Sequence, residues 1–256
     1  MQPDSLRLEL RSRRLQQDAG GFSQWREHID TVDWPCAATA LLLCDVWDRH
    51  WSRGASERVD AMVGRMDQVV AAARGRGLQI VHAPSDTMEF YAGTPARQRL
   101  RAAPEVMPPA ALERPDPPLP IDASDGGSDT GESGEESHRA WSRQHPGIAI
   151  DQERDGISDD GREVYGFLAQ QGIENLLVMG VHTNMCVLNR SFAIKQMVRW
   201  GMRVALIRDL TDAMYNPARP PYVSHAEGTD LVIGYIERFW CPSVDSGEIT
   251  ETRVVE

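Results

Sequence analysis

The chain has 256 residues, of which 41% are hydrophobic, and its formal net charge is −11 at pH 7. This length and composition suit one sizeable α/β domain that buries a core without covalent staples. The negative charge argues against nucleic acid or an anionic membrane as the main partner, so we expect a small-molecule substrate instead.

The cysteines and the N-terminal segment indicate the cellular setting. None of the four cysteines, Cys36, Cys44, Cys186 and Cys241, lies in a C-x-x-C pair, so we predict neither a zinc site nor a disulfide framework. The first residues are charged and lack the apolar stretch of a secretory signal. No apolar run reaches the roughly 18 residues of a membrane span. We therefore expect a cytoplasmic protein with reduced thiols.

The first half of the chain begins with a polar segment and then becomes regular. Residues 1–37 are polar and mixed, and we expect them to form an N-terminal arm that lies on a domain formed by residues 38–256. Residues 38–47 are a continuous apolar run that ends at an acid, which is typical of a buried parallel strand. Apolar residues at helical spacing predict an amphipathic helix over 55–77, and a second strand follows at 78–84.

A long insertion interrupts this rhythm at residues 84–147. It contains ten prolines, and its stretch 122–137 is acidic and rich in small residues. Such a composition predicts either a mobile loop or an ordered insertion without regular structure. Because a loop of this length is uncommon inside a compact domain, a functional role is one explanation for it.

After the insertion, predicted strands and helices alternate to the end of the chain. We expect strands at 147–150, 175–181, 203–209 and 241–244, and helices at 159–172, 184–201 and 222–240. This alternation predicts a mainly parallel sheet with helices on both faces.

Three polar residues follow predicted strands, at the edge where open parallel sheets bind ligands. They are Asp45, Asp86 and Cys186. We expect Cys186 two residues into its helix, where unpaired N–H groups lower the pKa of a thiol and can hold an oxyanion. A carboxylate nearby could accept the thiol proton. The alternative is that Cys186 is a small buried hydrophobic residue.

Four segments, ALLLCDVWDRHW, IVHAPSD, GVHTNMCV and IRDLTDA, resemble in order and spacing those of the isochorismatase-like cysteine hydrolase superfamily. That superfamily includes nicotinamidases, N-carbamoylsarcosine amidases and hydrolases of ureido compounds. The likeness covers roughly residues 38–245, and G-V-x-T-x-x-C-V is its most specific element. The resemblance implies a three-layer α/β/α fold around a mainly parallel, about six-stranded sheet. We also expect a homo-oligomer.

The resemblance also implies roles for individual residues. Asp45 would be the general base and Cys186 the nucleophile. The bond between Val181 and His182 would be cis, and the N–H groups of His182 and Cys186 would form the oxyanion hole. The implied activity is hydrolysis of a C–N bond in a small amide, imide or ureido compound.

One element of the family pattern is missing. The family's catalytic lysine falls in the region that matches residues 147–161, where this chain has no lysine. Lys195 is the only lysine of the chain, and on the predicted helix it points away from the site. Arg154, or failing that Arg143, could supply the positive charge and pair with Asp45. The alternative function is a catalytically inactive or altered relative that binds a small molecule.

The residues near the strand ends also suggest a pocket. We expect its walls to include Trp47, Trp51, His82, Asp86, Phe90, Tyr91 and His182. Flat rings there could enclose a planar amide or ureido group. Either His82 or His182 could also take over proton transfer.

We expect no cofactor, with a divalent metal as the weaker alternative. Family nicotinamidases bind a metal through an Asp-x-His triplet after the second strand, but here the triplet is Asp86-Thr87-Met88. Asp48 and His50, together with Asp86, are weak substitute ligands. The competing explanation is that Asp48 and His50 form hydrogen bonds at the base of a loop.

Overall fold

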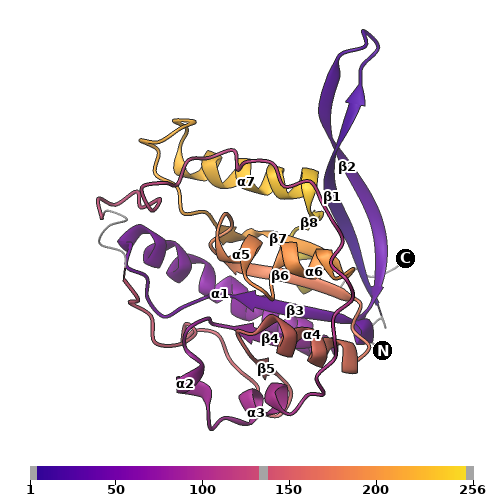
Figure 1. The fold of residues 1–256 in the computed structure, drawn as a ribbon, viewed down its shortest axis with the longest axis vertical. Helices are drawn as coiled ribbons and strands as arrows, with labels where there is room; N and C mark the ends of the chain where they lie inside the picture. Colours follow the sequence, from indigo (N-terminus) through magenta and orange to yellow (C-terminus); the bar gives the residue numbers. More distant parts are fainter. Residues whose placement is uncertain (1–4, 133–137, 252–256) are drawn as a thin grey trace.

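A computed structural model describes residues 5–132 and 138–251. They form one eight-stranded sheet in the order β2-β1-β8-β7-β6-β3-β4-β5, with helices on both faces (Figure 1). The strands are β1 (Ser5–Gln17), β2 (Ser23–Pro35), β3 (Thr39–Cys44), β4 (Gln79–Ala83), β5 (Gly156–Ile157), β6 (Asn175–Val181), β7 (Arg203–Asp212) and β8 (Ser243–Val244). The helices are the 3-10 turn η1 (Cys36–Ala38), α1 (Arg53–Gly75), α2 (Met88–Tyr91), α3 (Pro95–Arg101), α4 (Gly161–Gln170), α5 (Cys186–Asn189), α6 (Ile194–Arg199), α7 (His225–Phe239) and α8 (Gly247–Thr250).

Six of these strands, β3 to β8, pair in parallel, so the prediction of an α/β fold with a mainly parallel sheet is confirmed. Two further strands come from the N-terminal region. There β1 and β2 form an antiparallel hairpin, and β1 also pairs with β8 through Arg11 and Ser243. The expected arm is therefore part of the sheet, because Leu6, Leu8 and Leu10 alternate along β1 and are buried in the core. The far end of the hairpin extends beyond the body (Figure 1).

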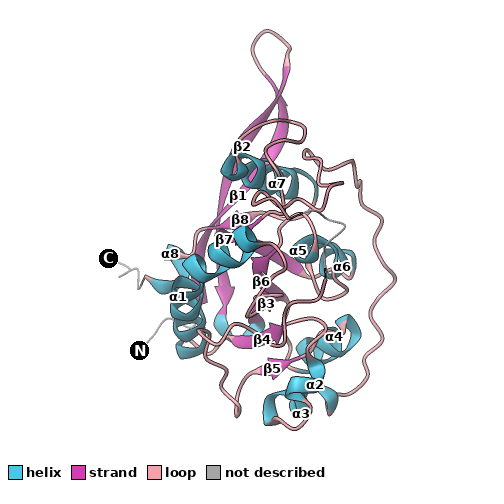
Figure 2. Ribbon diagram, turned by 90° about the vertical axis from the view of Figure 1, so that its left-hand side faces the viewer, coloured by secondary structure: helices cyan, strands magenta, loops and turns pink. Residues whose placement is uncertain are grey.

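The central strand β3 is buried on both faces. Leu42 and Cys44 face a core cluster that includes residues of α4, α5, α6 and α7. Leu41 and Leu43 face a second cluster, which includes α1, α8 and the inner part of β1. Figure 2 shows α1 and α8 on one side of the sheet and α5 and α6 on the other. Burial on both faces explains why this strand is continuously apolar in sequence.

Polar side chains cap the longer helices at their N-termini. Ser52 accepts a hydrogen bond from the backbone at the start of α1, and Asp160 does the same for α4. Ser224 and Glu227 form a capping box at the start of α7. These caps satisfy N–H groups that a helix leaves without an internal partner.

Two predicted elements differ from the structure. Residues 147–150 form no strand, and the edge strand β5 lies later, at Gly156–Ile157. The helix predicted over 184–201 is interrupted, because Arg190 has an extended backbone between α5 and α6. The interruption packs against α4: the Ser191 hydroxyl accepts a hydrogen bond from Gly161 N, and a side chain at Gly161 would collide with the Ser191 carbonyl.

The insertion contains α2 and α3 and then runs without regular structure. Residues 122–132 are anchored to the body by side-chain contacts at Asp122, Asp125, Ser128 and Asp129. This part is therefore an ordered insertion without helix or strand, and 133–137 lie outside the described residues. None of the helices in the described ranges combines the length and the apolar character that crossing a membrane requires.

Candidate active site

Asp45 lies directly after the carboxyl end of β3 and has no exposed surface. Its backbone N–H still donates to the Ala83 carbonyl of β4, and its backbone has a φ of 51°. One carboxylate oxygen accepts a hydrogen bond from Ser85 N at 2.7 Å, and the other accepts one from Arg190 Nε at 2.9 Å. The buried charge is therefore met by two donors, as a carboxylate in an apolar core requires.

Cys186 reaches the same place from the neighbouring strand β6. At Gly180 the backbone has a φ of 125° and runs so close to β3 that a Cβ would lie 2.0 Å from the Cys44 carbonyl oxygen. The Val181–His182 bond after it is cis, at the position that the resemblance implies. A turn then leads to Cys186, the first residue of α5, whose thiol lies close enough to the Asp45 carboxylate for the two groups to shift each other's pKa.

Arg190 is the basic residue of the site and was not among the predicted candidates. Its Nε lies 2.9 Å from Asp45 Oδ2, and its Nη2 lies 3.4 Å from Asp86 Oδ2. The Arg190 side chain is 33% exposed, whereas that of Asp45 is fully buried. The spacing carried a signal, because Arg190 follows Cys186 by four residues and residues at this spacing lie on one face of a helix.

The predicted replacements for the family lysine, Arg154 and Arg143, are wrong. Arg154 donates to the Arg74 carbonyl, and Arg143 stacks over an aromatic ring of the insertion. Within the described residues neither forms an ion pair with the buried carboxylate. Lys195 does point elsewhere, as expected, since it pairs with Asp116 at 2.8 Å.

The electrostatics of the pair differ from the expectation of a thiolate at a helix start. Burial raises the pKa of Asp45, while the charge of Arg190 opposes the rise. Burial and the adjacent Asp45 charge raise the pKa of Cys186 to about 12, again against the effect of Arg190. With only four residues, α5 has little dipole to offset these effects. The resting thiol is therefore protonated at neutral pH.

An aromatic stack covers one side of Asp45. The rings of Trp47 and Trp141 are parallel within 12°, with centroids 4.0 Å apart. His50 continues the stack beside Trp141 at 5.8 Å and contacts the edge of His182 at 4.8 Å. Trp51 lies 5.2 Å from His50. The structure thus brings Trp47, Trp51 and His182 together as predicted and adds Trp141 from the insertion.

Two other predicted pocket residues instead hold the insertion in place. The His82 ring is buried between Asp155, at 2.9 Å, and the Gln144 side chain, at 2.9 Å. Tyr91 is also buried, and its hydroxyl accepts a hydrogen bond from Gln144 N. Phe90 is 54% exposed and lies under the guanidinium of Arg143. His82 is therefore committed to a structural network rather than free for proton transfer.

The two histidines of the aromatic stack are neutral at pH 7. Burial lowers the pKa of His50 to about 4. Burial, with the nearby His50 as a smaller contribution, lowers the pKa of His182 to about 3. The Nε2 atom of His182 is buried without a hydrogen-bond partner in the described part of the chain. Such a ring is a weak base, so His182 is poorly suited to the proton transfer considered for it.

The weak metal candidates do not form a metal site. Asp48 accepts hydrogen bonds from the backbone and hydroxyl of Ser142, and His50 Nδ1 accepts one from Ser52 N. Asp86 pairs with the arginine of the site. Across residues 5–132 and 138–251, no three His, Cys, Asp or Glu side chains converge so that they could hold an ion. Asp48 and His50 are thus engaged in hydrogen bonds at the base of a loop.

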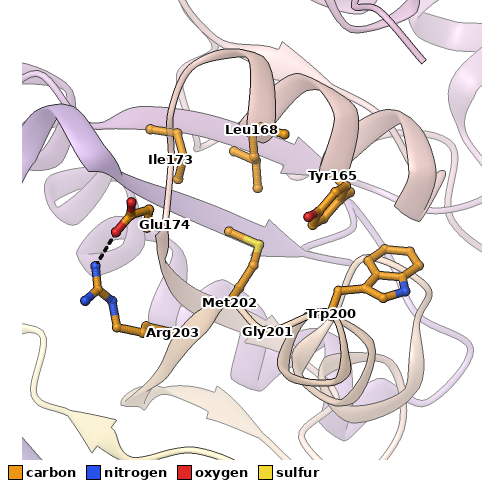
Figure 3. Close-up of a pocket in the computed structure, with 9 residues that line it drawn as sticks. Tyr165, Leu168, Ile173, Glu174, Trp200, Gly201, Met202 and Arg203 are labelled. Atoms are coloured by element: carbon orange, nitrogen blue, oxygen red, sulfur yellow. Dashed lines mark hydrogen bonds and ion pairs between the residues drawn. The ribbon is translucent and has the colours of Figure 1, made fainter. Parts of the chain in front are cut away.

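A separate cavity of about 380 Å³ lies at the amino-terminal ends of β6 and β7 (Figure 3). The rings of Tyr165 and Trp200 line one part of it, with centroids 5.2 Å apart. Glu174 and Arg203 form an ion pair at its other end. This is the edge of the sheet opposite the candidate catalytic pair, so the cavity does not belong to that site.

Comparisons with known proteins agree with the fold. Residues 39–219 match the Isochorismatase domain. A cysteine hydrolase from Pseudomonas syringae pv. phaseolicola superposes with a TM-score of 0.53 and 15% identity over 84% of this chain and 92% of the other. An isochorismatase-like protein from Burkholderia xenovorans gives a TM-score of 0.50 and 15% identity over 82% of this chain and 85% of the other. The comparison with curated protein sequences gives no match. The chain therefore belongs to the isochorismatase family.

Proposed function

We propose that this protein hydrolyses a C–N bond in a small amide, imide or ureido compound, with Cys186 as the nucleophile. Membership of the family supports a hydrolase. The observation that carries the proposal is the buried Asp45 carboxylate held between the Arg190 guanidinium and the Cys186 thiol. A nucleophile, a proton acceptor and a fixed positive charge thus lie near enough to one another to interact electrostatically.

The first half-reaction forms a thioester. The Cys186 thiol proton passes to an Asp45 oxygen while Sγ bonds to the substrate carbonyl carbon, and the carbonyl oxygen becomes an oxyanion. The N–H groups of His182 and Cys186 have no acceptor among the described residues, and they are the proposed donors to this oxyanion. When the C–N bond breaks, Asp45 returns the proton to the leaving nitrogen.

The second half-reaction uses water. Asp45, again a carboxylate, accepts a proton from a water molecule that attacks the thioester carbon. The C–S bond then breaks, the sulfur regains the proton from Asp45, and the acid product leaves. Because Asp45 both accepts and donates a proton in each half-reaction, a pKa raised by burial suits its role.

Arg190 supports this chemistry without moving a proton. Arginine hardly deprotonates in proteins, so it cannot replace a lysine as a proton carrier. Before attack it neutralises the Asp45 carboxylate, and after proton transfer it faces a thiolate beside a neutral acid. The positive charge is therefore paired in both states, which keeps the proton transfer from separating buried charges.

The test is a turnover screen over small amides, imides and ureido compounds with detection of released ammonia. Wild-type protein should hydrolyse at least one compound class, and Cys186→Ala and Cys186→Ser should not, with unchanged thermal unfolding. Intact mass after rapid quenching should show an acyl adduct on wild type that is absent from Cys186→Ala. Normal turnover by Cys186→Ala would exclude the covalent mechanism.

An inactive relative that binds a small molecule is the second candidate function. The observation in its favour is the raised pKa of Cys186, about 12, which leaves very little thiolate at neutral pH. Calorimetry with the same compounds separates the two functions. Saturable binding by both wild type and Cys186→Ala, without turnover by either, would support the binding function.

A further inference from the structure

We propose that the groove between the N-terminal hairpin and the end of α7 binds a small anion that carries a phosphate or carboxylate group on an apolar body. The groove has a volume of about 560 Å³. It is lined by both strands of the hairpin, by Arg114 of the insertion and by the chain from Glu237 to Pro242. Figure 1 shows the end of α7 beside this hairpin. The inference does not depend on the hydrolase activity.

The groove is positively charged on an otherwise acidic protein. Its charged lining residues are Arg13, Arg14, Arg114, Arg238, Asp30 and Glu237. Four arginines against two carboxylates leave a local charge of +2, on a chain whose formal net charge is −11. Such a local excess attracts an anionic ligand.

The two carboxylates of the groove are already paired with arginines, two of which, Arg13 and Arg14, also line the groove. Glu237 accepts hydrogen bonds from Arg11 Nε at 2.8 Å and Arg13 Nε at 2.9 Å. Asp30 lies 2.5 Å from Arg14 Nη2. Neither carboxylate is therefore available to the remaining two arginines as a direct partner.

Those two arginines, Arg238 and Arg114, form no ion pair within the described residues. The Arg238 guanidinium lies over the Trp25 ring, 5.6 Å from its centroid, and its Nε is buried without a hydrogen-bond partner in the described chain. The Ser12 hydroxyl, also in the lining, is buried and likewise unpartnered there. These two atoms have almost no exposed surface, so an anion in the groove would meet the terminal nitrogens of Arg238 and Arg114, which form no ion pair within the described residues.

Two of the arginines, Arg13 and Arg238, lie close together beside Gly234 of α7, which is not itself among the residues that line the groove. A Cβ placed on Gly234 would lie 3.5 Å from the guanidinium carbon of Arg13 and 3.7 Å from Nη2 of Arg238. Burial and, to a smaller extent, the charge of Arg13 lower the pKa of Arg238, while the charge of Glu237 opposes this. Arg13 already pairs with Glu237 and Glu27, so an anion in the groove would gain most from Arg238 and Arg114.

The lining determines the class of ligand. Guanidinium groups bind carboxylate and phosphate oxygens in matching, often bidentate geometry. The remaining walls include Leu10, Val32, Phe239, Trp240 and Pro242, which suit an apolar or aromatic body. The volume lies in the range typical of small-molecule sites and exceeds what a single phosphate ion needs.

The groove is remote from the candidate active site. The first residue of α7, His225, lies 2.8 Å from Asp212 at the carboxyl end of β7, the edge where the catalytic pair lies. The groove is at the other end of this 15-residue helix, about 22 Å away along its axis. Occupation of the groove therefore leaves Cys186 accessible.

Isothermal calorimetry on the full-length protein tests the proposal with phenyl phosphate, benzoate and inorganic phosphate. We expect saturable binding of one ligand per chain for phenyl phosphate or benzoate, and the tighter of the two identifies the anionic group. Inorganic phosphate should bind more weakly because it lacks the apolar body. Added salt should weaken binding, and Cys186→Ala should leave it unchanged.

Variants locate the site. Arg238→Gln and Arg114→Gln should each weaken binding about tenfold or more, as expected for loss of a hydrogen bond to a charged group. Arg7→Gln, on β1 but outside the groove, is the control and should bind like wild type. Thermal unfolding checks that each variant is folded. Absence of saturable binding, or equal binding by wild type and both arginine variants, would overturn the proposal.

Discussion

Replacing Arg190 by glutamine removes the positive charge that faces the buried Asp45 carboxylate. At the observed 2.9 Å, the attraction between the two charges is about 6 kcal/mol at an effective dielectric near 20. Desolvation of the two groups opposes this attraction by several kcal/mol. Loss of one partner from a buried pair typically costs about 3–5 kcal/mol, because the remaining charge stays buried without compensation. We therefore expect Arg190→Gln to lower the free energy of unfolding by up to this amount.

The loss should depend on pH, because Asp45 can take up a proton instead of staying charged. The folded-state pKa of Asp45 is raised above 3.8, and Arg190 opposes the rise, so Arg190→Gln raises it further. A raised pKa means that the folded state binds the proton more tightly than the unfolded state. The stability that this proton provides is present below the unfolded pKa and is lost as pH rises through the folded pKa. The destabilisation by Arg190→Gln should thus be small near pH 4 and grow toward neutral pH.

Urea unfolding of wild type and Arg190→Gln at several pH values between 4 and 8 measures this difference. Arg199→Gln is a matched control, since its side chain is 34% exposed and it pairs at 3.8 Å with the partly exposed Asp116. That exposed pair should contribute at most about 1 kcal/mol. In an Asp45→Asn background, the pH-dependent part of the Arg190→Gln effect should disappear. A destabilisation that is equal at all pH values, or that persists with Asn at position 45, would refute the reasoning.

Three further changes test other parts of the structure. Asp45→Asn should abolish hydrolysis but speed alkylation of Cys186 by iodoacetamide, because it removes a charge that raises the pKa of the Cys186 thiol. Slower alkylation would contradict this electrostatic reasoning. Gly180→Ala should lower the free energy of unfolding, measured with urea, by several kcal/mol, since its Cβ would meet a backbone carbonyl at 2.0 Å. Gly64→Ala in α1 is the control: its Cβ would enter free space, so the change should be neutral or stabilising. Similar effects of the two substitutions would contradict this reasoning. Leu8→Ala should lower the free energy of unfolding by about 2–5 kcal/mol, because Leu8 is fully buried. Leu15→Ala, at the exposed end of the hairpin, should change it by less than about 0.5 kcal/mol. Equal losses would show that the hairpin is not anchored through its inner part.

Much of the fold followed from local patterns in the sequence. The continuous apolar runs of β3 and β6 reflect burial on both faces, and alternation with amphipathic helices predicts parallel connections. Because parallel strands end at one edge, the segments that follow β3 and β6 lie close together, which predicted that Asp45 and Cys186 share one site. The hairpin also had a local signal that was overlooked, the alternation of Leu6, Leu8 and Leu10.

Only the tertiary structure decided which basic residue serves the site. Several arginines were available at plausible distances in sequence, and periodicity alone favoured a continuous helix through residue 190. Contact with the start of α4 interrupts that helix, and the Arg190 side chain then lies between Asp45 and Asp86. The path of the insertion, which brings Trp141 onto Trp47, was likewise undetermined by sequence. Ion pairs and ring contacts between distant segments depend on how whole elements pack, and local propensity carries no information about such packing.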